Sequence, residues 1–287
     1  MFFVINRGSL VIPSTCTFVS DNFCFLPILY LVYLSFTTGG FSQEGARWVG
    51  LHNYQQLLLS PDFWQVIGNT LYFTVATVLP TMVLPLFLAV GLNQGIKGRD
   101  WLRTAYFLPT MTSIVAAGLG FRWLFQTDGP VNQLVQTFGG QPIAWLSDPT
   151  WAMPVLILLS SWKQLGFNLV VFLAGLQTIP RDRYEAALLD GANAWQQFRH
   201  ITLPGLRPTL VLVFVTTTIF TLRSFEQVYV VTGGGPLDTT NLLVFYIYQQ
   251  AFALFDFGYA AAAATLLLGV TLGLLWLQLR TRQDPNL

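Results

Sequence analysis

The sequence predicts an all-α membrane protein with six transmembrane helices, from its composition, its long apolar segments and the placement of its basic residues. Apolar residues make up 53% of the 287-residue chain and charged residues only 9%, whereas soluble domains carry about 25% charged residues. A helix of about 20 apolar residues crosses a hydrocarbon core of about 30 Å. Backbone polar groups in lipid must be satisfied internally, so helices are the expected form, and the alternating pattern of barrel strands is not seen.

Six apolar segments define the predicted spans within a single membrane domain, residues 1–287. The first segment is the least regular, because residues 1–22 include Arg7, Pro13 and Asp21 and lack one continuous apolar run. A signal peptide is an alternative there, although no small-residue cleavage site stands out. The predicted spans are 10–36, 67–92, 104–125, 151–179, 209–231 and 257–278, and a loop at 180–208 joins the fourth to the fifth.

Basic residues concentrate on one side of these spans. They follow spans two, four and six, as Lys97, Arg99 and Arg103, then Arg181, Arg183, Arg199 and Arg207, then Arg280 and Arg282. The opposite loops hold Arg47 alone, and residues 127–150 and 225–256 contain neither Lys nor Arg. Cytoplasmic loops carry the excess of Lys and Arg. Both termini and the loop 180–208 are therefore predicted to face the cytoplasm.

Composition and motifs argue against several function classes. A net charge of +1 with thinly spread basic residues does not predict nucleic-acid binding. Neither lysine, Lys97 in GIKGRD or Lys163 in SWKQLG, lies in the GxxxxGK[ST] context of a P-loop. HExxH, CxxC and GxSxG motifs are also missing from the sequence, and Cys16 and Cys24 form no metal-like pattern with the two histidines, although a disulfide between them stays open. No catalytic residue, metal or cofactor is expected, and any ATP hydrolysis would need another chain.

The most specific segment is YEAALLDGANAWQQFRHITLPGLRP, residues 184–208. Its first part contains good helix formers, and Gly191 can adopt the positive φ that ends a helix. Asn193, with Gln196 three residues later, resembles a capping pair that begins a second helix. The expected result is a helix–Gly–helix element on the membrane surface. Two prolines are expected to end the second helix, Pro204 and Pro208.

This segment fits the pattern EAAxxDGAxxxxxFxxIxLPxxxP, which resembles the signature loop of permease subunits of binding-protein-dependent ABC importers. Shorter elements occur in the order found in the carbohydrate-uptake branch of that family, as in maltose-type and glycerol-phosphate-type permeases. They are VGLHNY at 49–54, NT at 69–70, FLP at 107–109, WLSDP at 145–149, TGGGP at 232–236 and GYAAA at 258–262. Together they cover about residues 25–280.

The resemblance implies the membrane subunit of an ATP-driven importer in a bacterial inner membrane. It implies a second permease subunit, two copies of an ATP-binding subunit, an extracytoplasmic solute-binding protein and a sugar-like substrate moved by alternating access, with lipid around the spans. The ATPase would dock on the loop 180–208, where small side chains permit close approach. The residues carried over to that contact are Glu185, Ala186, Ala187, Asp190, Gly191, Ala192 and Pro204.

A stand-alone secondary transporter or channel for a small polar solute is the alternative from another class. Such a protein should show buried carboxylates for ion coupling, or discontinuous spans in two related halves. Glu226 is the one candidate carboxylate within a predicted span, and the sequence has no obvious internal repeat.

Two polar stripes are the candidates for a solute path. By helical spacing, one face of span four carries Ser160, Gln164, Phe167 and Asn168, and one face of span five carries Thr217, Thr221 and Ser224. Hydroxyls and amides beside an aromatic ring suit a sugar, and related permeases line their path with these two spans. Hydrogen bonding between packed helices is the other explanation for such stripes. The residues expected to face a cavity are Ser160, Gln164, Phe167, Thr221 and Ser224.

Four charged residues within or near the spans are further candidates, because intramembrane charges are costly. Arg122 can extend toward the outer surface, and Arg223 with Glu226 can neutralise one another at helical i,i+3 spacing. Lys163 has no evident partner in its own helix.

Overall fold

The computed structural model describes residues 14–38, 47–93 and 99–283, with side chains for 25–38, 47–93 and 105–280. The predicted start of the first span at 10–13, the basic Lys97 and the side chains of both cysteines lie outside this part. The elements are α1 Ser14–Ser35, β1 Thr37–Thr38, β2 Arg47–Trp48, α2 His52–Leu59, α3 Pro61–Leu92, α4 Arg99–Met111, α5 Ile114–Leu124, α6 Pro130–Thr137, α7 Pro149–Gln177, α8 Arg181–Leu189, α9 Ala194–Gln197, η1 Phe198–Thr202, α10 Leu203–Gly205, α11 Arg207–Leu222, α12 Glu226–Val231, α13 Leu243–Tyr248, η2 Gln249–Ala253 and α14 Phe257–Gln283.

Three helices in the described residues are long and apolar enough to cross a membrane, namely α3, α7 and α14, and the bent pair Ala194–Gly205 with α11 makes a fourth candidate. Local signals fix where the first two begin. Ser60 accepts a hydrogen bond from the amide of Phe63 at 3.4 Å, and Asp148 Oδ1 accepts one from the amide of Thr150 at 2.7 Å. A proline follows each cap within the first turn, where its missing N–H costs nothing.

Two predicted spans are not single helices. The segment 104–125 is divided into α4 and α5 at Thr112–Ser113, and the segment 209–231 into α11 and α12 at residues 223–225. Pro109 lies in the last turn of α4 and removes a helical donor. At the second break the Ser224 hydroxyl donates to the carbonyl of Phe220 at 3.3 Å, a local bond that competes with the helical ladder. Hydropathy alone could not reveal either break.

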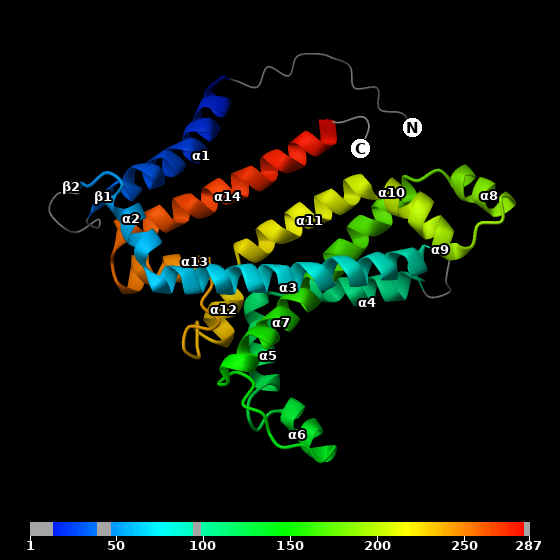
Figure 1. Cartoon of the computed structure of the whole chain (residues 1–287), viewed down its shortest axis with the longest axis horizontal. Coiled ribbons are helices and arrows are strands. Elements are labelled where there is room, and N and C mark those ends of the chain that lie inside the picture. Colours follow the sequence, from blue (N-terminus) through cyan, green and yellow to red (C-terminus); the bar gives the residue numbers. More distant parts are fainter. Residues whose placement is uncertain (1–13, 39–46, 94–98, 284–287) are drawn as a thin grey trace.

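The helices α3 and α7 cross near the middle of the molecule and are in extensive contact (Figure 1). Two apolar clusters hold them, one around the fully buried Phe172 and one around the fully buried Phe73. On α7 the first cluster takes residues 169–176 and the second takes residues 153–159. The polar stretch of α7 between them is where the candidate solute-path residues lie.

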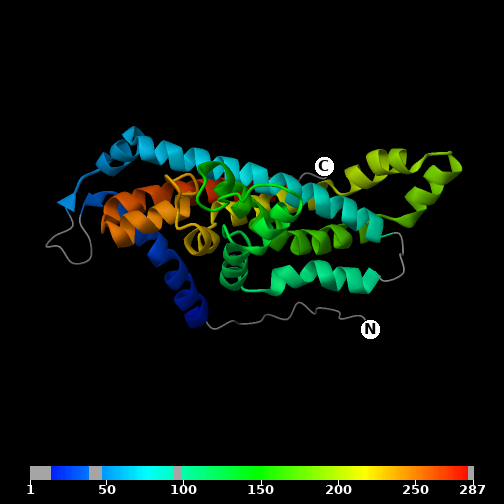
Figure 2. The same cartoon turned by 90° about the horizontal axis from the view of Figure 1, so that it is seen from below.

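The two ends of the molecule are built from different elements. Figures 1 and 2 show β1, β2, α2, α13 and the start of α14 at one end and α8 to α10 at the other. At the first end, Asn53 donates hydrogen bonds of 2.9 Å to the carbonyls of Ser35 and Thr37, which ties α2 to the end of α1. Asn69 donates to the carbonyl of Asp238 at 2.8 Å and attaches the segment that follows GGGP to α3. These asparagines of the VGLHNY and NT elements therefore have structural contacts.

Candidate functional site: a central cavity and a protruding loop

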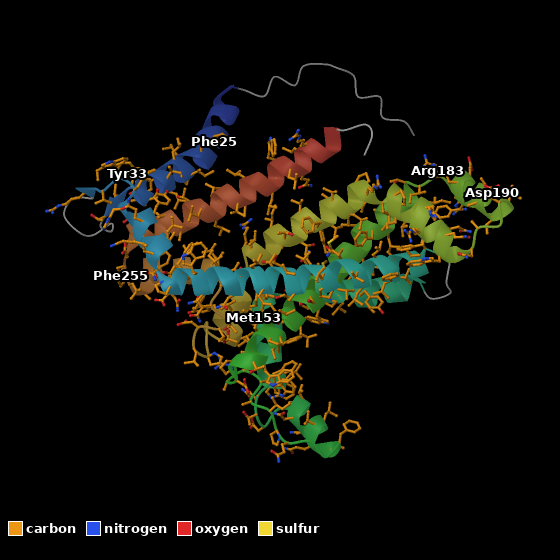
Figure 3. All side chains as sticks on the ribbon, in the orientation of Figure 1. Phe25, Tyr33, Met153, Arg183, Asp190 and Phe255 are labelled. Carbon is orange, nitrogen blue, oxygen red and sulfur yellow. The ribbon has the colours of Figure 1, made fainter. Side chains whose placement is uncertain are left out.

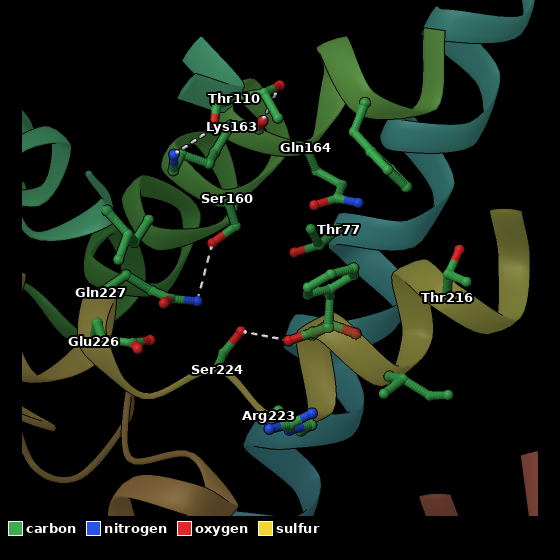
Figure 4. Close-up of a pocket in the computed structure, with 15 residues that line it drawn as sticks. Thr77, Thr110, Ser160, Lys163, Gln164, Thr216, Arg223, Ser224, Glu226 and Gln227 are labelled. Carbon is green, nitrogen blue, oxygen red and sulfur yellow. Dashed lines mark hydrogen bonds between the residues drawn. The ribbon is translucent and has the colours of Figure 1, made fainter. Parts of the chain in front are cut away.

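A cavity of about 560 Å³ lies between α3, α4, α7, α11 and α12 (Figure 4). All five residues expected on a solute path line it. The lining consists of Thr77, Thr110, Ile114, Ser160, Lys163, Gln164, Phe167, Thr216, Ile219, Phe220, Thr221, Arg223, Ser224, Glu226 and Gln227. Thr77 and Lys163 lie near the middle of α3 and α7, and both helix breaks border the cavity. The cavity is therefore at mid-height of the long helices.

Most polar groups of the lining are already engaged within the protein. The hydroxyl of Thr221 donates to the carbonyl of Thr218 at 2.9 Å, and Gln227 Nε2 donates to Ser160 Oγ at 3.5 Å. Gln164 has only a long contact of 3.4 Å from its Nε2 to Asn168 Oδ1. The buried hydroxyl of Thr77 has no hydrogen-bond partner among the described residues. Gln164, Arg223 and Glu226 thus keep the most hydrogen-bonding capacity for a solute, since the two charged side chains are exposed and have no hydrogen-bond partner among the described residues. The Thr77 oxygen is buried and does not reach the open space.

An aromatic pair completes one wall of the cavity. The rings of Phe167 on α7 and Phe220 on α11 meet edge to face with centroids 6.4 Å apart. An aromatic ring offers its face to the C–H groups of a sugar, while amides and hydroxyls serve its polar groups. The wall combines both kinds of contact.

The charged residues in the spans have different environments from those expected. Lys163 Nζ donates to the carbonyls of Pro109 and Thr110, at 3.1 and 3.2 Å, and to that of Thr112, all at the end of α4. Arg122 Nη1 donates to the carbonyl of Val230 in the last turn of α12 at 3.4 Å. Each cation therefore satisfies the end of a neighbouring short helix.

Arg223 and Glu226 do not form the helical i,i+3 pair that the sequence suggested. The helix is broken between them, both side chains are exposed, and no ion pair joins them in the part of the chain that the structure describes. The expectation is wrong because it assumed a continuous helix over 209–231.

The polar stripe of α7 divides into two kinds of residue. Asn168, which is fully buried, donates to the carbonyl of Thr81 on α3 at 2.7 Å and to Thr217 Oγ1 on α11 at 3.1 Å. Asn168 and Thr217 therefore join three helices, as the packing explanation requires, whereas Gln164 faces the cavity. Helical spacing places Gln164 and Asn168 on one face and cannot separate these roles.

The second candidate site is the loop from Pro180 to Pro208, which projects from the end of the molecule. Its first helix, α8, has no buried residue, and the Arg183 and Asp190 side chains lie at the tip in Figure 3. Glu185, Ala186, Asp190, Gly191 and Pro204 are exposed, and Ala187 and Ala192 are partly exposed. All seven residues expected at an ATPase contact are therefore accessible.

Local sequence signals explain the shape of this loop. Gly191 has φ +78, as expected for the residue that ends α8. Asn193 and Gln196 exchange the two hydrogen bonds of a capping box, at 2.9 and 2.8 Å, and begin α9. The second helix does not end at the prolines, however. Pro204 lies inside α10 and Pro208 in the first turn of α11, because a proline is tolerated in a first turn.

A few contacts hold the loop together and attach it to the membrane helices. Tyr184 and Thr202 share a hydrogen bond of 2.9 Å between their hydroxyls, which ties α8 to η1. Phe198 stacks on Phe87 of α3 with ring centroids 5.7 Å apart. The axes of Ala194–Gly205 and α11 differ by 67°, so the loop is a bent extension of α11. Among the described residues no group of three or more His, Cys, Asp or Glu could hold a metal ion.

Residues 81–283 match the family of binding-protein-dependent transport system inner membrane components. The chain belongs to this family. It is a membrane component of a transport system and not an enzyme. Discontinuous spans were expected of the alternative, a secondary transporter. The breaks in the segments 104–125 and 209–231 show that they also occur in an ABC permease.

Similar proteins come from several sugar importers. The chain is 37% identical to the lactose transport system permease protein LacF of Rhizobium radiobacter, over 92% of this chain and 89% of the relative. It is 39% identical to the arabinooligosaccharides transport system permease protein AraP of Bacillus subtilis (strain 168), over 78% and 72%. A chain of a bacterial ABC transporter for the acidic polysaccharide alginate superposes with a TM-score of 0.78 and 27% identity, over 93% of this chain and 94% of that one.

Proposed function

We propose that this permease carries a sugar or sugar-like solute across the bacterial inner membrane through the cavity between α3, α7 and α11. The observation that carries the proposal is that Ser160, Gln164, Phe167, Thr221 and Ser224 line one mid-height cavity that combines amides, hydroxyls and aromatic rings. Substrate sites formed by discontinuous helices at the middle of the membrane are a recurring arrangement in transporters. LacF and AraP are permeases of lactose and arabinooligosaccharide transport systems, which agrees with this solute class.

The proposed assembly contains this chain, a second permease subunit, two ATP-binding subunits and an extracytoplasmic solute-binding protein. A related alginate transporter has been solved in complex with its oligosaccharide-bound periplasmic protein, at 26% identity to this chain and a TM-score of 0.78. The ATPase would contact the loop Pro180–Pro208, where Glu185 can pair with a cation and Ala186 permits close approach. Solute movement would then follow ATP-driven closure of the ATPase pair.

The transport assay uses the four-component transporter in liposomes with radiolabelled lactose, arabino-oligosaccharides and alginate oligosaccharides as probes. Uptake of at least one probe that requires ATP and the binding protein is the expected result. Uptake that is driven by an ion gradient without ATP would overturn the proposal. So would uptake of a non-sugar solute by a transporter that takes up none of the saccharides.

Gln164→Leu should lower uptake of the transported saccharide about tenfold, because one hydrogen bond to the solute is lost at about 1.5 kcal/mol. The measurement is initial uptake rate with ATP hydrolysis followed in parallel. Gln177→Leu is the matched control, since it makes the same change at an exposed position at the end of the same helix. Equal rates in both variants would mean that Gln164 does not contact the solute.

The proposed topology has six spans with both termini and the loop Pro180–Pro208 in the cytoplasm. Leu189 and Phe138 are 90% and 89% exposed and lie in loops proposed to face opposite sides. In a chain with Cys16 and Cys24 replaced by Ser, Phe138→Cys should react with an impermeant thiol reagent added to intact cells. Leu189→Cys should react only after the membrane is opened, and labelling of both from outside would contradict six spans.

A further inference from the structure

The side chain of Lys163 lies beside the cavity but is directed at the backbone of α4 and not into open space (Figure 4). Its ammonium group donates to three carbonyls, those of Pro109, Thr110 and Thr112. The last four carbonyls of any helix lack an intrahelical donor, and a cation at that end also meets the negative pole of the helix dipole. Lys163 therefore supplies the hydrogen-bond donors that the carbonyls at the end of α4 lack.

The attachment of α4 to α7 is reciprocal and close. Thr110 Oγ1 donates back to the carbonyl of Lys163 at 3.2 Å. One turn further along α7, a Cβ added at Gly166 would lie 2.8 Å from Thr110 Oγ1 and 2.9 Å from Phe107 Cα. These distances are shorter than normal contacts, so glycine is what permits the two helices to approach. The cavity ends of α4 and α7 are thus held at Lys163 and Gly166.

The half of the span that follows the break is attached elsewhere. A Cβ added at Gly118 of α5 would lie 3.2 Å from Val230 Cγ1 of α12, and Arg122 donates to the Val230 carbonyl. The break at Thr112–Ser113 therefore separates an α4–α7 pair from an α5–α12 pair. The helix α7 leads directly into the loop Pro180–Pro208, and Thr110 in the last turn of α4 lines the cavity. Movement at the loop end can reach the cavity wall along the α4–α7 pair.

We propose that Lys163 is a positioning residue that locks α4 to α7, so that ATP-driven movement at the loop end reaches the break at Thr112–Ser113 beside the cavity. It acts through the α4 carbonyls and not through a contact with the solute. This role depends on membership of the importer family and not on the solute being a sugar.

The test uses the assembled transporter and a thiol at the break. Ser113→Cys is introduced into a chain with Cys16→Ser and Cys24→Ser, because Ser113 is exposed and its side chain makes no capping bond. The rate of alkylation at position 113 is compared between the nucleotide-free and vanadate-trapped states. We expect two different rates in this parent chain. Lys163→Met should bring the ratio of the two rates toward one. Losing a charge-assisted hydrogen bond changes the equilibrium between α4 attached to α7 and α4 detached from it by about tenfold.

Two variants separate positioning from charge. Lys163→Arg, which can still donate to carbonyls, should restore the ratio of the parent chain. Arg122→Met removes a cation from the α5–α12 pair and should leave the ratio of the two alkylation rates unchanged. Equal rates in the two states of the parent, an unchanged ratio in Lys163→Met, or an equal loss in Arg122→Met would each overturn the proposal.

Gly166→Ala tests the same attachment if the transporter with Lys163→Met does not assemble. Gly166→Ala keeps the lysine but presses a methyl group against Thr110 and Phe107, so it should weaken the same attachment and reduce the ratio. The ratio of the parent chain in Gly166→Ala would contradict the lock. No solute is needed for any of these measurements, so their failure is distinct from failure of the saccharide assay.

Discussion

Gly191→Val is expected to detach the ATP-binding subunit from this permease while the chain still inserts in the membrane. Gly191 has φ +78 and lies between α8 and α9. A left-handed conformation costs an ordinary L-residue about 1–2 kcal/mol, and a β-branched residue is a marked outlier there. Apart from its two chain neighbours, no atom of the described residues lies within 4 Å of a Cβ added at this position. The effect therefore arises from the backbone, which would change the angle between the two loop helices.

The measurement for Gly191→Val is co-purification of the ATPase with the permease, together with ATP hydrolysis stimulated by the binding protein. Gly191→Asn is the matched control, because asparagine adopts positive φ far more readily than valine does. It should retain most of the association. Full association and stimulation in the valine variant would remove the angle of this loop from the coupling mechanism.

The loop was predictable from sequence because its signals are local. A glycine that ends one helix and an Asn–Gln pair that begins the next act within a few residues, and the structure has both at Gly191 and Asn193. The prediction from the two prolines was wrong because a local signal can have two outcomes. Pro204 and Pro208 were expected to end a helix, but a proline also fits the first turn of a new one. Which of the two occurs depends on the chain direction after Leu206, a fully buried residue at the bend.

The helix breaks were not predictable, because the local features at them, Pro109 and Ser224, also occur in continuous helices, and distant segments satisfy the groups that a break leaves free. The break after α4 is satisfied by Lys163, about fifty residues further along the chain, and hydropathy records only that both segments are apolar. The cavity was predictable in part. Spacing placed Gln164, Phe167 and Asn168 on one face, but only the neighbouring helices decide that Asn168 packs against α3 while the other two meet the cavity.

Asn168 has a specific partner that a proline creates. In a helix the carbonyl of Thr81 would accept a bond from the N–H of residue 85, but Pro85 has no N–H. Asn168 Nδ2 donates to that carbonyl at 2.7 Å and replaces the missing bond. Lys163 serves α4 in a similar way, so α7 supplies polar side chains to two neighbouring helices whose backbone is incompletely paired. Interrupted helices persist in a membrane only where neighbours satisfy the freed groups.

Asn168→Leu should therefore lower stability by about 2 kcal/mol, because it leaves the buried carbonyl of Thr81 and the hydroxyl of Thr217 without their partner. Thermal unfolding of the purified transporter in detergent measures the loss as a lower Tm. Pro85→Ala returns an N–H to position 85. In that background Asn168→Leu should cost about half as much, since Thr81 regains a donor within its own helix.

Thr217→Val is the matched control for the other bond of Asn168. It removes the contact of 3.1 Å with Asn168 Nδ2 but leaves the one to Thr81. Its cost should stay near the average of about 0.6 kcal/mol measured for hydrogen bonds between membrane helices, and Pro85→Ala should not change it. An equal cost of Asn168→Leu with and without Pro85 would mean that the hydrogen bond to Thr81 adds no stability, because only that bond depends on the proline.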